Sequence, residues 1–306
     1  MDRATSRREF LNRVVATSAA AVAGTAAGRS AWAADPVKRE VSGSKYKFTL
    51  SGYSYRKLLT GDNPECTLDD FVRDCARFGL EGTEPTSYYF PQPVTNEYLC
   101  QLKALAFRLG LSMSSTAVGN KFALPPGEAR DQQIADVKKW IDHAAVLGAP
   151  VIRIFSGRLG KNQTEDEAIR LAVEAIEECC DYAGQQGIML GLENHGGLTS
   201  TADGMLKIIH AVKSPWFGAW MDSGNFREGD VYGELEKIAP YTIHVQLKVV
   251  TASPDGERVP SDFPRLAKIL DKVGYRGWIC LEYEEDEDPR VACPKYLDQI
   301  RSAFGG

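Results

Sequence analysis

The sequence contains little histidine, and its cysteines form no recognisable metal-binding or disulfide pattern. There are four histidines and seven cysteines in 306 residues. No cysteine spacing resembles a zinc site, and an odd number of cysteines cannot all pair within one chain. We therefore expect free thiols, mostly buried as small hydrophobic side chains. The cysteines are Cys66, Cys75, Cys100, Cys179, Cys180, Cys280 and Cys293.

The sequence also lacks an excess of positive charge, a glycine-rich phosphate loop and a long apolar run. The net charge is −5, which disfavours binding to nucleic acid. Without a phosphate-binding glycine motif, a phosphorylated ligand is not favoured. The apolar stretch 14–27 is short and rich in alanine, so we do not expect it to span a membrane stably.

The N-terminus has the features of an export signal. Residues 6–11 read Ser-Arg-Arg-Glu-Phe-Leu, the apolar stretch 14–27 follows, and residues 31–33 read Ala-Trp-Ala. These features predict a cleaved twin-arginine signal peptide over residues 1–33 and a periplasmic or otherwise exported protein. A disordered N-terminus with a chance arginine pair is the alternative. Removing residues 1–33, which carry +3, leaves −8, and residues 34–45 are expected to be a flexible tether.

The remaining residues, 46–306, alternate between short apolar strands and amphipathic helices. The expected strand ends are 24 to 39 residues apart, which leaves room for one helix between successive strands. Eight such units predict a closed (β/α)8 TIM barrel in a single domain. Helix starts are indicated by Thr67 and Thr164, each followed three residues later by an acid. The expected strand ends are Ser54, Glu84, Thr116, Phe155, Glu193, Asp222, Gln246 and Glu282.

Four of these strand ends carry oxygen-bearing side chains and are expected to meet at the barrel mouth, where such barrels have their active sites. They are Glu193, Asp222, Gln246 and Glu282. Several buried carboxylates need compensation, because each uncompensated ion costs several kcal/mol. Arg153 could neutralise one of them. A hard divalent cation is the simplest partner for the oxygen donors.

Other polar residues are expected near the mouth because side chains alternate between the two faces of a strand. His244, Gln246 and Lys248 share one face of their strand, and we expect it to point into the barrel. Some polar residues near the mouth are candidates for binding substrate. The alternative is that they only form structural ion pairs or lie on a loop without a role in binding. The candidate substrate-binding residues are His195, Lys248, Arg153, Asn225 and Glu84.

The strand-end motifs resemble those of the sugar phosphate isomerase/epimerase family, among the xylose isomerase-like barrels. The motifs are Leu-Glu-Asn-His at 192–195, Met-Asp-Ser-Gly-Asn at 221–225, His-Val-Gln-Leu-Lys at 244–248 and Ile-Cys-Leu-Glu-Tyr at 279–283. The resemblance extends over about residues 46 to 303. It implies a metal held by two glutamates, an aspartate and usually a histidine, with the glutamates on either side of the substrate carbon.

Transferred to this chain, the resemblance makes Glu193 and Glu282 both metal ligands and the acid/base pair. Asp222 becomes a further ligand, and Gln246 stands where the family usually has histidine. An all-oxygen ligand set favours Mn²⁺ or Mg²⁺ over Zn²⁺, while Co²⁺ and Zn²⁺ stay open. Whether Gln246 replaces the histidine as a ligand is not settled by the sequence.

The resulting hypothesis is an exported, metal-dependent sugar isomerase or epimerase acting through an enediolate. A lyase or dehydratase acting on a keto-sugar or a 3-keto-glycoside would use the same proton abstraction. A non-catalytic carbohydrate-binding barrel is the alternative from another class, because Gln246 departs from the family pattern. Apurinic-site endonucleases share the barrel, but four histidines and a net charge of −8 without the signal argue against that activity. A small sugar is the expected partner, and a homo-oligomer stays open.

Overall fold

The computed structural model describes residues 45–305. The expected signal peptide over 1–33 and nearly all of the expected tether over 34–45 lie outside the described residues. In the described part, no helix is both long enough and apolar enough to cross a membrane. All seven cysteines are free, five of them buried, Cys66 partly so and Cys100 exposed, which confirms the expectation of unpaired, mostly buried thiols.

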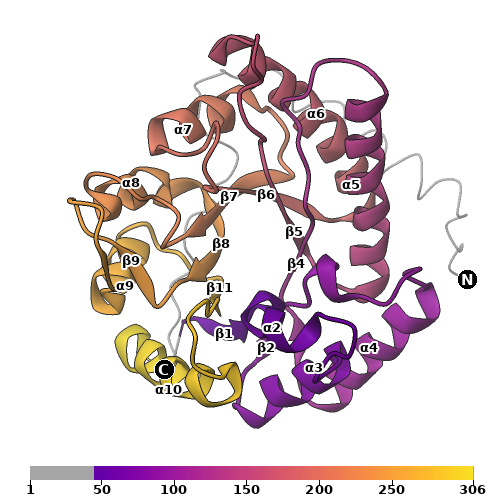
Figure 1. The fold of residues 1–306 in the computed structure, drawn as a ribbon, viewed down its shortest axis with the longest axis vertical. Helices are drawn as coiled ribbons and strands as arrows, with labels where there is room; N and C mark the ends of the chain where they lie inside the picture. Colours follow the sequence, from indigo (N-terminus) through magenta and orange to yellow (C-terminus); the bar gives the residue numbers. More distant parts are fainter. Residues whose placement is uncertain (1–44, 306) are drawn as a thin grey trace, which may run out of the picture. The chain divides into compact units, whose positions relative to one another are not determined.

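A curved parallel sheet forms the centre of the fold (Figure 1). Seven strands follow one another around it in the order β1-β11-β8-β7-β6-β5-β4, and every neighbouring pair is parallel. Parallel neighbours place the carboxyl ends of all these strands at the same edge. The strands are β1 (Lys47–Leu50), β4 (Thr116–Ala117), β5 (Val151–Ile154), β6 (Met189–Glu193), β7 (Phe217–Asp222), β8 (Thr242–Leu247) and β11 (Trp278–Leu281).

Two further short strands close the ring between β1 and β4. Strand β2 (Gly82–Thr83) lies beside β1, since the Glu84 amide donates to the Leu50 carbonyl at 3.1 Å, and it pairs in parallel with β3 (Ser112–Met113). Strand β3 leads through two serines into β4. The expected third strand is therefore divided into two, and with β3 and β4 counted together the described residues contain the predicted eight-stranded barrel.

The division of the third strand has a local cause in its serines. The Ser114 hydroxyl donates to the Thr83 carbonyl at 3.1 Å and lies 3.0 Å from the Thr49 hydroxyl. The Ser115 hydroxyl donates to the Glu84 carboxylate. Serine side chains that bond neighbouring polar groups compete with regular ladder bonding. Strand propensity alone does not reveal this competition.

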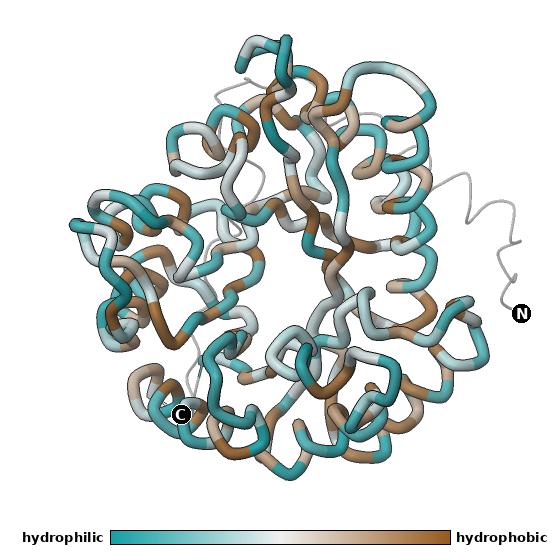
Figure 2. The backbone as a smooth tube through the Cα atoms, in the orientation of Figure 1, coloured by the Kyte–Doolittle hydropathy of each residue, from teal (hydrophilic) through white to brown (hydrophobic). Residues whose placement is uncertain are grey.

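Helices surround the sheet, as the alternating pattern predicts (Figure 1). Their inner faces contribute apolar side chains to the layer between helices and strands, and hydrophilic residues are frequent on the outer loops (Figure 2). The main helices are α3 (Leu68–Arg77), α4 (Asn96–Arg108), α5 (Glu128–Leu147), α6 (Glu165–Gln186), α7 (Ala202–Ala211), α8 (Val231–Ile238), α9 (Phe263–Lys272) and α10 (Pro289–Phe304).

The structure differs from the expected elements at two places on the mouth side. The first strand ends at Leu50 rather than Ser54, because the Ser51 hydroxyl accepts from the Tyr53 amide and starts the 3-10 helix η1 (Gly52–Tyr55), followed by α2 (Arg56–Leu59). A hairpin of β9 (Val250–Ala252) and β10 (Arg258–Pro260) follows β8. Both insertions are too short for a clear hydrophobic period.

The predicted capping box at the start of α3 is present and gives a stability test. The Thr67 hydroxyl accepts from the Asp70 amide at 3.2 Å, and the Asp70 carboxylate accepts from the Thr67 amide at 2.9 Å. Thr67→Ala is expected to lower the free energy of unfolding by about 1 kcal/mol in urea titrations. Thr67→Ser keeps the oxygen and should lose much less. Equal losses in the two variants would contradict the capping role.

Candidate active site at the barrel mouth

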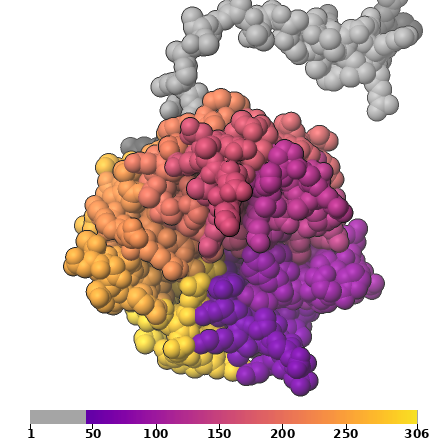
Figure 3. All heavy atoms as spheres, turned by 45° about the horizontal axis from the view of Figure 1, so that its top comes forward, coloured from indigo at the N-terminus to yellow at the C-terminus, as the bar shows by residue number. Residues whose placement is uncertain are grey.

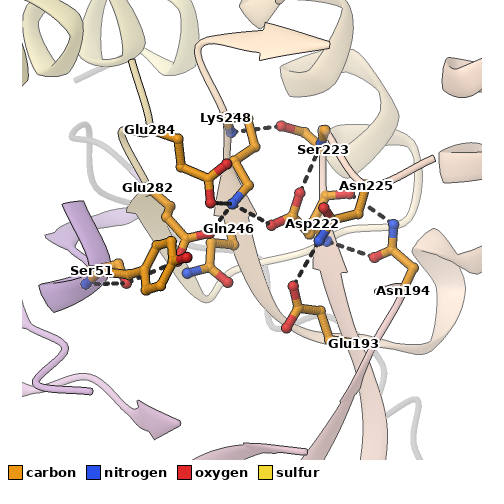
Figure 4. Close-up of polar contacts among 12 residues, drawn as sticks. Ser51, Glu193, Asn194, Asp222, Ser223, Asn225, Gln246, Lys248, Glu282 and Glu284 are labelled. Carbon is orange, nitrogen blue, oxygen red and sulfur yellow. Dashed lines mark hydrogen bonds and ion pairs between the residues drawn. The ribbon is translucent and has the colours of Figure 1, made fainter. Parts of the chain in front are cut away.

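Four strand-end side chains lie at the same edge of the sheet (Figure 4). Glu193 and Asp222 are the last residues of β6 and β7, Gln246 is the last but one of β8, and Glu282 directly follows β11. All four are buried. Asp222 is the register partner of Gln246 across the β7–β8 pair. Parallel strands therefore position these side chains as the sequence pattern predicts.

The ammonium of Lys248 lies among three of the acids at the mouth (Figure 4). Its Nζ is 2.8 Å from Glu284 Oε1 and 3.4 Å from Asp222 Oδ2, and it also contacts Glu282 Oε2. Burial alone would lower the pKa of Lys248, but the three carboxylates outweigh burial and raise it. The side chain is thus a fixed cation at neutral pH.

Glu193 is held from two sides by groups that donate hydrogen bonds. Arg153 Nε is 3.2 Å from Glu193 Oε2, and Asn225 Nδ2 donates to Glu193 Oε1 at 2.8 Å. Burial raises the pKa of Glu193, the Arg153 charge opposes this, and the nearby Asp222 and Glu282 carboxylates reinforce it. Near neutral pH, such a carboxyl can both accept and release a proton.

Glu282 has a similar environment on the other side of the mouth. Ser51 Oγ donates to Glu282 Oε1 at 3.3 Å, and Lys248 contacts the other carboxylate oxygen. Burial raises the pKa of Glu282, while Lys248 lowers it and the Asp222 and Glu284 carboxylates raise it further. Two buried carboxyls with raised pKa values are the kind of pair that general acid–base catalysis uses.

The charges at the mouth do not balance without a further cation. Among the described residues, three buried carboxylates, those of Glu193, Asp222 and Glu282, contact two buried cations, Arg153 and Lys248. Fully ionised, this buried set would carry one surplus negative charge, the exposed Glu284 adds a further acid beside Lys248, and buried ions without partners are costly. A divalent cation would supply the missing charge, and carboxylate and amide oxygens are ligands that Mn²⁺ and Mg²⁺ accept.

Individual oxygens at the mouth are consistent with such an ion. Asp222 Oδ1 accepts from the Gly224 amide at 2.8 Å, whereas Asp222 Oδ2 is buried and, among the described residues, has the Lys248 ammonium at 3.4 Å but no hydrogen bond. Gln246 Oε1 accepts from Trp220 Nε1 at 2.8 Å, and an amide oxygen has a second lone pair. The residues therefore fit a divalent cation in charge and in donor type.

The carboxylates of Glu193, Asp222 and Glu282 are nevertheless not gathered into one tight cluster. Among the described residues, the group of acidic, histidine and cysteine ligand atoms within 4.8 Å of one another is Glu84, His244 and Cys280. This buried group could hold a metal ion. Sequence reasoning did not single it out, although His244 and Cys280 each precede an expected ligand by two residues and so share its strand face.

Glu84 lies in the interior of the barrel, below the mouth residues. His244 Nε2 is 3.1 Å from Glu84 Oε2, and Gln246 Nε2 donates to Glu84 Oε1 at 3.4 Å. Burial would raise the pKa of Glu84, but hydrogen bonds from His244 and Ser115 outweigh it and lower the pKa. Glu84 is thus a satisfied interior carboxylate whose bonds connect three strands below the mouth.

His195 lies on the loop that follows β6 and is exposed. Its ring centroid is 4.5 Å from that of Phe155. The Arg153 guanidinium lies over the Phe155 ring, 4.0 Å from the ring centroid. Desolvation, together with the nearby Arg153 and Lys248 charges, lowers the pKa of His195 to about 4. The imidazole is therefore neutral near pH 7.

The chain is similar in sequence to known proteins over most of its length. It is 26% identical over 259 residues to the inosose dehydratase of Erwinia tasmaniensis, covering 72% of this chain and 84% of that protein. It is 24% identical over 248 residues to a putative hydroxypyruvate isomerase of Homo sapiens, covering 73% of this chain and 86% of that protein.

The fold is shared with solved enzymes. The D-psicose 3-epimerase of Clostridium cellulolyticum H10, solved with D-tagatose, matches with a TM-score of 0.70 at 15% identity, covering 84% of this chain and 99% of that one. At that identity, the likeness establishes the fold alone. The model of the family described as xylose isomerase-like TIM barrel matches residues 72–302. The chain belongs to this xylose isomerase-like TIM barrel family.

Proposed function

We propose that this protein is an exported, divalent-metal-dependent sugar isomerase or epimerase. The main support is the pair of buried carboxyls, Glu193 and Glu282, each held in place by polar or charged side chains at the barrel mouth. They lie at the ends of non-adjacent strands and border the same mouth. Relatives that are named as an isomerase and a dehydratase, and a structural neighbour named as an epimerase, agree with proton chemistry on small oxygenated substrates.

The two carboxyls have complementary roles in this proposal. One carboxylate removes a proton from the carbon beside a ketone, and the other carboxyl returns a proton to the resulting enediolate. Return to the opposite face of the same carbon gives an epimer, and return to the neighbouring carbon gives an aldose–ketose isomer. Asn225 and Arg153 fix Glu193, while Ser51 and Lys248 fix Glu282.

The metal would be held by Glu193, Asp222, Gln246 and Glu282. When bound, Mn²⁺ or Mg²⁺ supplies Lewis acidity that polarises a substrate carbonyl. Co²⁺ or Zn²⁺ would serve the same role. Binding and orientation of the sugar are assigned to residues around this centre. These residues are His195, Lys248, Arg153 and Asn225. Glu84 was expected from the sequence to bind substrate, but it is fully buried and already bonded to His244, Gln246 and Ser115, so its proposed role is to position Gln246 from below.

A lyase acting on a keto-sugar or a 3-keto-glycoside is the second candidate. It is favoured by the dehydratase relative, which covers most of both chains. The first step is the same proton abstraction, after which a β-substituent leaves instead of a proton returning. The products distinguish the two, because isomerisation conserves mass whereas elimination gives an unsaturated sugar and a released group.

Ketoses and 3-keto-glycosides incubated with purified protein and Mn²⁺ test the proposed function. We expect a product of unchanged mass by chromatography and mass spectrometry. Chelation should abolish turnover, and added Mn²⁺ should restore it. Metal-free protein that binds sugars without converting them would instead favour a non-catalytic carbohydrate-binding barrel.

Export is tested separately. Replacing Arg7 and Arg8 by lysine should retain the protein in the cytoplasm.

A further inference from the structure

Gln246 is held from below by a closed ring of buried side chains. Its Oε1 accepts from Trp220 Nε1 at 2.8 Å, and its Nε2 donates to Glu84 Oε1 at 3.4 Å. His244 Nε2 is 3.1 Å from Glu84 Oε2, and the His244 ring stacks on Trp220 with 3.9 Å between the centroids. Each member therefore contacts two others. We call Trp220, Gln246, Glu84 and His244 the support ring.

Strand geometry places the support ring directly below the mouth. Trp220 precedes Asp222 by two residues and His244 precedes Gln246 by two, so each shares a strand face with the residue above it. The β7–β8 register pairs Trp220 with His244 and Asp222 with Gln246. Glu84 directly follows β2 and reaches the same level from across the barrel. The two register pairs thus form successive layers of the interior.

The support ring is closed to solvent. Trp220, Glu84 and His244 are 0% exposed and Gln246 is 3% exposed. The space-filling view shows a shaded hollow on the face where the loops that follow β6 and β7 approach the C-terminal segments (Figure 3). The members of the support ring are buried beneath the surface. Water is therefore not at hand to replace a lost partner, and hydrogen bonds in such surroundings hold their groups firmly.

The partners of Gln246 determine which end of its amide is the oxygen. The two ends have the same shape, so the groups that they meet decide the assignment. An indole N–H only donates, and an ionised carboxylate only accepts. Glu84 also receives hydrogen bonds from Ser115 and His244, which favour its ionised form. Turning the amide over would place N–H against N–H at Trp220 and oxygen against oxygen at Glu84.

The oxygen of Gln246 keeps one lone pair for a further partner. An amide oxygen has two lone pairs, and the Trp220 donor uses one of them. The nitrogen is committed to Glu84 and has no lone pair to give to a cation. Gln246 is the register partner of Asp222, a proposed metal ligand. The atom that Gln246 can offer to a cation at the mouth is therefore its oxygen.

We propose that Trp220 is a positioning residue for the proposed metal site: with Glu84 it fixes the Gln246 amide so that the oxygen, and not the nitrogen, is offered to a divalent cation. This inference rests on the proposed function and gives the cause of one ligand's orientation. It assigns a role to an interior tryptophan that the sequence did not single out. Side chains that hold a metal ligand in place typically contribute about 10–100-fold of metal affinity.

Calorimetric titration of metal-free protein with Mn²⁺ tests this role without any turnover. Trp220→Phe keeps a ring that can stack on His244 but removes the N–H donor, and should raise the Mn²⁺ dissociation constant about tenfold. In the Gln246→Ala background, adding Trp220→Phe should have no further effect, because the residue that it positions is gone. An equal loss in both backgrounds would show a merely structural role and overturn the proposal.

Trp278→Phe is the matched control. Trp278 lies at the start of β11, at the opposite end of the strand from Glu282, so this variant should keep the wild-type dissociation constant. The proposal is also overturned if Trp220→Phe binds Mn²⁺ as tightly as the wild type does. That result would leave the proposed function standing, whereas a wild type that binds no Mn²⁺ would overturn both.

Nuclear magnetic resonance of metal-free, isotope-labelled protein tests the hydrogen bond itself and does not depend on the folding of Trp220→Phe. The indole N–H signal of Trp220 should lie downfield in the wild type, as expected for a hydrogen-bonded proton. In Gln246→Ala it should move upfield, while the Trp278 signal stays in place. A Trp220 signal that is unchanged in Gln246→Ala would overturn the proposal.

Discussion

Replacing Glu193 with glutamine should lower kcat by about 10²–10⁴-fold, the usual contribution of a general acid or base. Glutamine keeps the size of the side chain and can still accept from Asn225, but it cannot carry the substrate proton. The same loss is expected for Glu282→Gln, since each glutamate performs one of the two transfers. Steady-state rates on the ketose identified by the screen provide the measurement.

The control for these variants is Glu174→Gln, because Glu174 lies on the outer face of α6, away from the mouth. It should retain wild-type kcat. Thermal unfolding of each variant shows whether the fold is kept. A well-folded Glu193→Gln protein with nearly wild-type kcat would remove Glu193 from the proton-transfer pair.

Lys248→Met is expected to lower the stability of the metal-free protein by about 3–5 kcal/mol, the cost of removing one partner from a buried ion pair. Lys248 is the cation that lies among Asp222, Glu282 and Glu284. Without its ammonium, these carboxylates lose the cation that contacts all three of them. Urea titration of chelated protein gives the free energy of unfolding.

Added Mn²⁺ should stabilise Lys248→Met more than it stabilises the wild type, because a ligand that binds only the folded state raises its stability. The metal would replace the charge that the lysine supplied. Lys237→Met is the control, since Lys237 makes partly exposed ion pairs with Asp203 and Glu234 and none with the acids around Lys248. Little loss of stability in Lys248→Met, together with no response to Mn²⁺, would show that the mouth does not depend on cation compensation.

The sequence predicts the barrel because its long elements repeat one pattern. The helices around Leu68–Arg77 and Glu165–Gln186 have clear apolar faces and threonine N-caps, and the structure has both. The strand ends at Glu193 and Asp222 are also found where the pattern placed them. Periodicity is informative for such elements because burial on one face determines their composition.

Features that depend on contacts between distant segments could not be predicted in this way. The break between β3 and β4 depends on Ser114 meeting Thr83 across strands, and the hairpin after β8 has too few residues for a period. The position of Lys248 among three acids is another case. Its strand face follows from alternation, but its partners come from β7 and the loop after β11, which only the closed barrel brings together.

The proposed function depends most on direct proton transfer between Glu193, Glu282 and a substrate carbon. Nuclear magnetic resonance of the reaction in heavy water measures this step, because a proton lost to a carboxyl exchanges with solvent. We predict that deuterium appears on the carbon beside the ketone in wild type, and that Glu193→Gln and Glu282→Gln strongly reduce its incorporation. Full turnover by the wild type without any solvent deuterium in the product would contradict the proposed mechanism.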